Sequence, residues 1–153
     1  MSVLVTLAAL AGLSACSPAD KPVLALRVLD GQPTLLVAEC AVFTADRISV
    51  FTIGVTPTAK WAIIREGGEK VATVTLLESP SGWRLEQQSL VAFERDIVYS
   101  VAAYGDQNKA ESVHFTLAQV SELRPEQVLV SDGGTKRKAV TETAFRDRAR
   151  KAC

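Results

Sequence analysis

The chain contains one histidine, His114, which makes it the first residue to consider for acid–base chemistry. Apolar and polar residues alternate over 113–117, so His114 is predicted to point away from the core, onto a solvent face. A Ser–His–Asp arrangement also needs a nucleophile and an orienting acid, and the sequence has no nucleophile elbow. We therefore interpret His114 as a surface histidine and predict no catalytic residue.

Other residue types that could carry chemistry are scattered along the chain. Glu78, Glu86 and Glu94 show no pairing that would support a glycosidase. The stretch Gly133-Gly134-Thr135-Lys136 lacks the glycine spacing and the Lys-Ser/Thr ending of a phosphate loop, so we expect a flexible turn there. Isolated cysteines and a single histidine offer no ligand spacing, so we predict no metal site and no cofactor.

The N-terminal residues carry a pattern with a chemical consequence. Residues 3–13 are mostly apolar, which suits a signal-peptide h-region and falls short of the roughly 20 residues that span a bilayer. Leu13-Ser14-Ala15-Cys16 closes this run, and the polar stretch 17–22 is suited to a flexible tether. This order resembles the lipobox of bacterial lipoproteins. The resemblance implies that Cys16 is lipidated and holds the chain on the extracytoplasmic face of the cell membrane.

The leader departs from this pattern in one respect. A signal peptide begins with basic residues, whereas no Lys or Arg lies between Met1 and Cys16. We therefore expect translation to start upstream of Met1. Two other interpretations stay open, namely a secretory leader cut near Ala15 with an incidental Cys16, and a buried N-terminal strand.

If Cys16 carries lipid, Cys40 and Cys153 remain as an even pair in an oxidising compartment. We then expect a disulfide that ties the C-terminal segment to an early strand. A loop of more than 100 residues would be closed, for which chain entropy gives about 4.7 kcal/mol. The alternative is two free thiols, one in a strand and one at a frayed end.

The elements that would position these residues are mostly strands. β-branched residues and period-2 alternation dominate over 23–117, and turn residues such as Asp30-Gly31 separate the segments. Many short strands at this spacing predict an all-β fold, either a sandwich or a barrel. The expected strands are 23–29, 34–42, 47–54, 60–65, 70–77, 83–86, 88–93, 97–104 and 111–117.

The last residues change character. We predict one or two helical turns at 118–123, a short strand at 128–130 and a helix that begins at the N-cap Thr141. This helix is too short to be stable alone, so Phe145 must dock in the core. The expected organisation is a signal peptide (1–15), a lipidated cysteine and tether (16–22), a β-sandwich (23–117) and a C-terminal extension (118–153) with a helix at about 141–152, packed on the sandwich.

Two segments resemble the fibronectin type III and immunoglobulin families, and this resemblance implies an antiparallel β-sandwich. Residues 61–68 look like a central strand of such a sandwich entering a turn. Residues 93–103 are similar to the fibronectin type III pattern of a large apolar residue, a turn, and a tyrosine followed by alternating apolar residues. The resemblance implies that Tyr99 is a tyrosine-corner residue whose hydroxyl bonds to the upstream backbone. Arg95-Asp96 stands where that family has Pro-Gly. The whole chain also resembles uncharacterised actinobacterial lipoproteins, through the lipobox and the segments 78–83, 113–117 and 145–153, which implies no activity.

Charge is distributed unevenly along a chain whose net charge is zero. Residues 136–151 hold seven basic and two acidic side chains, so this segment is +5 and the remainder is −5. Such asymmetry favours an anionic partner or an internal contact. Lys136, Arg137 and Lys138 are the candidates for contact with anionic lipid head groups or wall polymers, and a solvated face is the alternative. The expected location excludes nucleic acid as a partner.

Two aromatic residues are the candidates for ligand contact. Trp83 follows the loop 79–82, and Tyr104 ends an expected strand, although core packing is the alternative for Trp83. Together these features predict a non-enzymatic binding or scaffold module of the cell envelope, with an unknown envelope protein or polymer as partner. The alternatives are an inhibitor or accessory subunit of an envelope enzyme or toxin and, ranked last, a cell-wall hydrolase.

Overall fold

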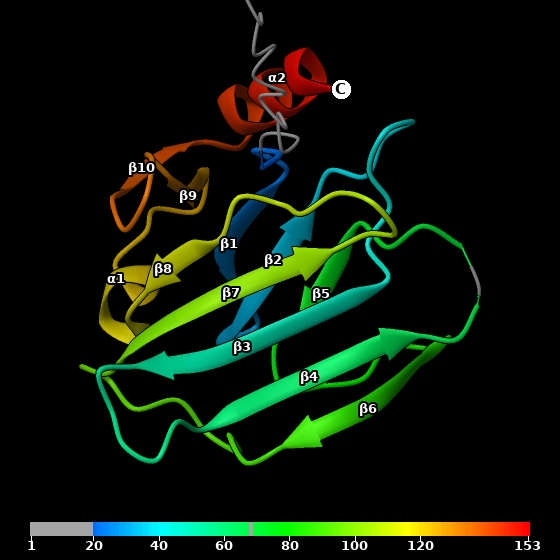
Figure 1. The fold of residues 1–153 in the computed structure, drawn as a ribbon. Helices are drawn as coiled ribbons and strands as arrows, with labels where there is room; N and C mark the ends of the chain where they lie inside the picture. The colour runs from blue at the N-terminus through cyan, green and yellow to red at the C-terminus, as the bar shows by residue number, and fades with distance from the viewer. Residues whose placement is uncertain (1–19, 68) are drawn as a thin grey trace, which may run out of the picture.

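The computed structural model describes residues 20–67 and 69–153, so the predicted signal peptide and Cys16 lie outside the described residues. Two five-stranded antiparallel sheets pack together, and the C-terminal helix lies at one end of the pair (Figure 1). The predicted all-β sandwich with a short C-terminal helix is thus confirmed.

The first sheet contains the first and the last strand of the described chain. Its turn at Asp30 and Gly31 joins the first two strands, and both residues have positive φ (50° and 78°), as a type I′ hairpin turn requires. The sheet has the order β10-β9-β1-β2-β5, with β1 (Leu24–Leu29), β2 (Gln32–Val37), β5 (Thr73–Thr75), β9 (Gln127–Ser131) and β10 (Arg137–Thr141).

The second sheet carries the aromatic cluster of the core. The hydroxyl of Tyr99 accepts a hydrogen bond from the backbone N–H of Glu94 at 2.8 Å, as expected for Tyr99, and its ring packs against Phe93 and Phe115. The sheet has the order β6-β4-β3-β7-β8, with β3 (Arg47–Ile53), β4 (Lys60–Arg65), β6 (Trp83–Gln88), β7 (Val98–Tyr104) and β8 (Val113–Phe115).

Two helices complete the fold. The short α1 (Leu117–Ser121) begins at a capping box formed by Thr116 and Gln119. The longer α2 (Glu142–Ala152) begins after Thr141, whose hydroxyl accepts from the N–H of Ala144 at 3.2 Å. The docking predicted for Phe145 is present, because this side chain is only 1% exposed and packs into the same core as the two sheets.

Several strand boundaries differ from the expected ones. β2 ends at Val37 because the chain then turns back, with the N–H of Cys40 bonded to the carbonyl of Phe43 at 2.9 Å. β5 ends at Thr75, because Leu77 adopts a positive φ of 69° in a turn. Residues 83–88 form one strand, and the strand expected at 88–93 is not formed, since the N–H groups of Ser89 and Leu90 both turn onto the carbonyl of Lys60.

The first sheet also extends past residue 117, where we expected the sandwich to end. β9 pairs with β1, and β10 pairs with β9 as an edge strand. β10 lies in the C-terminal extension, at residues for which no strand was predicted. It contains Arg137 and Lys138, and charged residues of this kind suit an edge strand because they oppose pairing with another chain.

Candidate functional site

The strongest candidate site is a pocket beside α2, about 440 Å³ in volume, which we call the α2 pocket. One stripe of the helix lines it, formed by residues spaced i, i+3, i+4 and i+7, the spacing that places side chains on one helical face. The end of β2 and the segment before β5 form the opposite wall. The lining residues are Val37, Ala38, Glu39, Cys40, Lys70, Val71, Ala72, Arg146, Ala149, Arg150 and Cys153.

A disulfide between Cys40 and Cys153 forms part of the pocket wall. Their Cα atoms are 6.0 Å apart, and the bond joins the end of α2 to the segment that follows β2. The predicted pairing is therefore present in the structure. The start of the described chain lies at the same end of the molecule, because the ammonium group of Lys21 donates to the carbonyl of Ala152 at 3.4 Å.

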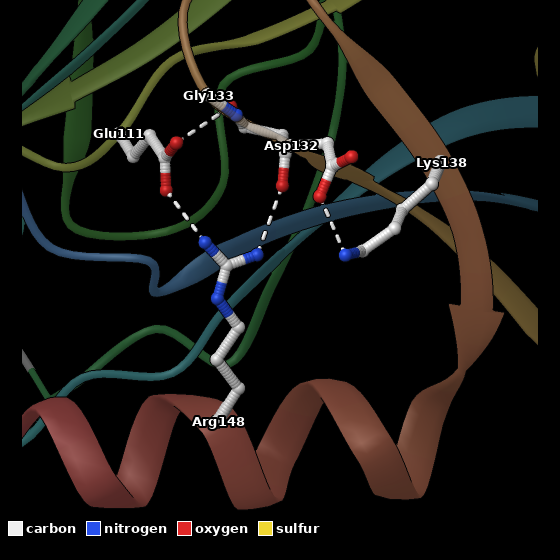
Figure 2. Close-up of polar contacts among 6 residues, drawn as sticks. Glu111, Asp132, Gly133, Lys138 and Arg148 are labelled. Atoms are coloured by element: carbon white, nitrogen blue, oxygen red, sulfur yellow. Dashed lines mark hydrogen bonds and ion pairs between the residues drawn. The ribbon is translucent and has the colours of Figure 1, made fainter.

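A polar network holds α2 against the first sheet, as Figure 2 shows. The guanidinium group of Arg148 donates to the carbonyl of Ser131 at 2.9 Å and to the carboxylate of Glu111 at 3.1 Å. The Ser131 hydroxyl donates to the other oxygen of Glu111 at 2.8 Å. Each carboxylate oxygen of Glu111 thus accepts a hydrogen bond from within the protein. We therefore interpret these contacts as structural, since they hold α2 in the position that forms the pocket.

The start of α2 is fixed in a similar way. Arg27 of β1 donates to Glu142 at 2.7 Å, and Glu142 also pairs with Arg146 one turn further along. The helix is thus attached to the first sheet at its start and its middle, and to the segment after β2 at its end. Such attachment keeps the pocket geometry defined in the absence of a ligand.

Three basic side chains, Lys70, Arg146 and Arg150, lie on the rim of the α2 pocket. All three residues are exposed, and Arg150 has 78% of its side chain accessible. Arg146 contacts Glu142, and Arg150 contacts Asp147, but neither acid lines the pocket. The rim therefore presents positive charge above a largely apolar wall.

The pocket wall also holds one buried carboxylate, that of Glu39, whose side chain is 2% exposed. Its Oε1 accepts from the N–H of Ala45 at 2.9 Å and from the guanidinium of Arg65. Its Oε2 has no hydrogen-bond partner within residues 20–67 and 69–153. A buried polar atom without a partner is unusual and needs an explanation.

The two aromatic candidates do not form one surface. Trp83 is 9% exposed and belongs to the core, with the Arg65 guanidinium 5.1 Å from its ring centroid, so the core-packing interpretation holds for it. Tyr104 lies on β7, separated from β6 by β4 and β3. Its ring is half-buried, with Arg47 and Lys109 each 5.9 Å from the centroid.

The basic run 136–138 is partly engaged within the protein. Lys138 pairs with Asp132 at 2.5 Å, and this hydrogen bond lowers the pKa of the Asp132 carboxyl (Figure 2). Lys136 precedes β10 and is exposed. His114 is half-buried on β8, and its pKa is lowered first by burial and then by the positive charge of Arg137.

The residues on the pocket rim were not among the site predictions. Arg146 and Arg150 looked like solvent-facing helix residues, although counting back from Cys153 by three, four and seven residues gives the stripe that lines the pocket. Lys70 comes from a loop 76 positions earlier than Arg146, and only the tertiary fold places both residues at one pocket. Glu39 likewise becomes notable only through its burial.

A second pocket of about 390 Å³ lies among the loops 41–46 and 105–108. The Asn108 amide donates to the Val42 carbonyl at 2.7 Å across it, and its lining contains two aspartates and no basic residue. In the described part of the chain, no group of three or more His, Cys, Asp or Glu side chains could hold a metal ion.

Within the same residues, neither helix has the length and apolar character needed to cross a bilayer. No protein-family model, curated protein or solved structure matches this chain.

Proposed function

We propose that this protein is a lipid-anchored, non-enzymatic binding module of the cell envelope, with the α2 pocket as its ligand site. The observation that carries the proposal is the pocket itself, which combines an apolar wall, a basic rim and a disulfide. The leader pattern that ends at Cys16 supports the anchor. The contact between Lys21 and Ala152 supports a tether that leaves the domain beside the pocket.

The chemistry of the pocket lining favours binding over catalysis. Glu39 is already paired with Arg65, and the two cysteines are joined to each other. Lysine and arginine side chains on a rim bind and orient anions. A pocket fixed by a disulfide and by the ion pairs of α2 is preorganised, which reduces the entropy cost of binding.

The test is to purify the protein gently from membranes of its native host and measure its mass by native mass spectrometry. We expect a non-covalent ligand mass that Ala72→Trp removes, because Ala72 lines the pocket and is exposed. Ala139→Trp, at an exposed position on β10, is the matched control and should retain the ligand. Equal ligand loading in both folded variants would contradict the proposed site.

The anchor is tested separately in the same host. Cys16→Ser should move the protein from the membrane fraction to the soluble fraction, since a diacylated cysteine holds a protein stably at a bilayer. Intact mass should show the acyl chains on the wild-type chain that begins at Cys16. Unmodified Cys16 with residues 1–15 still attached would overturn the anchor.

A further inference from the structure

We propose that the α2 pocket takes a single-chain amphiphile with an anionic head group. This inference rests on the proposed binding function and specifies its ligand. The apolar chain lies against Val37, Val71 and Ala149, and the anion lies at Lys70, Arg146 and Arg150.

The size and lining of the pocket fit an apolar chain. Its volume of about 440 Å³ lies within the range of about 300–1,000 Å³ that is typical of small-molecule sites. Apart from the buried Glu39, which is paired with Arg65, the wall opposite the rim consists of valine and alanine side chains and the disulfide. An aliphatic chain gains free energy there by leaving water.

The rim selects the sign of the head group. Lys70 and two arginines are the basic lining residues, and the acidic lining residue, Glu39, is neutralised by Arg65. Arg150 uses its Nη2 on Asp147, which leaves its other N–H donors available to an anion. A carboxylate or phosphate group is complementary to such a rim, and a cationic head group would be repelled.

The place of the pocket in the molecule also favours an amphiphile. The Lys21–Ala152 contact brings the expected tether to the same end of the domain. A pocket beside a membrane tether is well placed to receive an amphiphile.

The inference is tested by calorimetric titration of the full-length protein with decanoate. Decanoate should bind with one-to-one stoichiometry, whereas acetate and decyltrimethylammonium should not bind measurably. Arg150→Glu should weaken decanoate binding by about tenfold or more, the size expected for a charge-assisted hydrogen bond. Lys151→Glu makes a similar charge change at an exposed position that does not line the pocket, and should leave binding within about twofold.

Three results would contradict the inference, each in a different way. Equal weakening by Arg150→Glu and Lys151→Glu would show attraction by overall charge and would overturn the site. Binding of decyltrimethylammonium as strong as that of decanoate would overturn the anionic class. Co-sedimentation with phosphatidylglycerol vesicles that Ala72→Trp leaves unchanged, without binding of free decanoate, would assign the anion to a bilayer surface and also overturn the inference.

Failure of this inference is distinguishable from failure of the proposed function. If decanoate does not bind but the native protein still loses a ligand mass in Ala72→Trp, the pocket binds another class of molecule. If neither decanoate nor a native ligand depends on Ala72, both proposals fall. Circular dichroism on each variant confirms that the fold is intact.

Discussion

At the residue scale, His114 shows how the pKa of a side chain on the outer face of a strand is lowered by its surroundings. Its neighbours Val113 and Phe115 are buried, so it takes the opposite face, as the alternation predicted. Partial burial, and then the charge of Arg137, lower its pKa below the ordinary value of 6.5. Arg137 lies near His114 only because β10 pairs with β9, and the sequence pattern did not predict this pairing.

The lowered pKa of His114 leads to a pH-dependent stability. The unfolded chain binds a proton at its ordinary pKa, whereas the folded protein binds it only at lower pH. Stability is therefore lost as the pH falls through about 6.5 towards the folded value, and His114→Gln should reduce that loss. Thermal melts at about pH 7.5, 6.5 and 5.5 measure this. The same pH dependence in both proteins would show that His114 contributes nothing.

Element-scale predictions were most successful where burial imposes a pattern. The strands β1, β3, β4 and β7 have apolar residues on the core side, and their predicted bounds are close to the observed ones. β10 was missed, since an edge strand with basic residues has little apolar signal. The strand predicted at 88–93 is not formed. Its composition is typical of a strand, but the chain turns away from the sheet at Ser89 and Leu90.

The helix α2 depends on its docking into the core. Phe145 is buried in the core shared by both sheets, so Phe145→Ala should lower the free energy of unfolding by about 3–5 kcal/mol. Thr143→Ala on the exposed side of the same helix should change it by no more than about 0.5 kcal/mol. Urea unfolding of the three proteins provides the comparison. A small effect of Phe145→Ala would mean that α2 packs loosely.

The polar network beside Phe145 gives a second prediction for α2. Arg148→Met leaves Glu111 and the Ser131 carbonyl without their donor from the helix, and should destabilise the protein by about 1–3 kcal/mol. Hydrogen exchange should show faster opening of residues 142–152 in this variant. Lys138→Met, which removes an exposed pair with Asp132, is the control and should cost less than about 1 kcal/mol. Equal exchange in both variants would contradict a docking role for Arg148.

At the scale of the whole molecule, the disulfide links the segment that follows β2 to Cys153 across a sequence separation of 113. Cysteine count and the expected compartment were sufficient to predict this pair. They did not predict the α2 pocket, because Lys70 and Glu39 reach it only through the packing of the two sheets and the helix. The lipid anchor at Cys16 remains a prediction from the leader pattern.

Loss of the disulfide should affect both stability and binding. The double substitution Cys40→Ser and Cys153→Ser should lower the free energy of unfolding by about 2–5 kcal/mol, because the unfolded chain regains the freedom of a long loop. Decanoate binding should weaken, since Cys153 and Arg150 lie on the same lining stripe. Unfolding and titration with and without reductant measure both effects. Full stability and unchanged affinity in the double variant would contradict the role of the disulfide.

The account depends most on the α2 pocket being a ligand site, and nuclear magnetic resonance tests this directly. On addition of decanoate to the ¹⁵N-labelled protein, we predict that amide signals shift for the residues that line the pocket, namely 37–40, 70–72, Arg146, Ala149, Arg150 and Cys153. Signals of residues 105–108, in the loop pocket, should stay in place. Shifts confined to the loop pocket, or no shifts at saturating decanoate, would contradict the account.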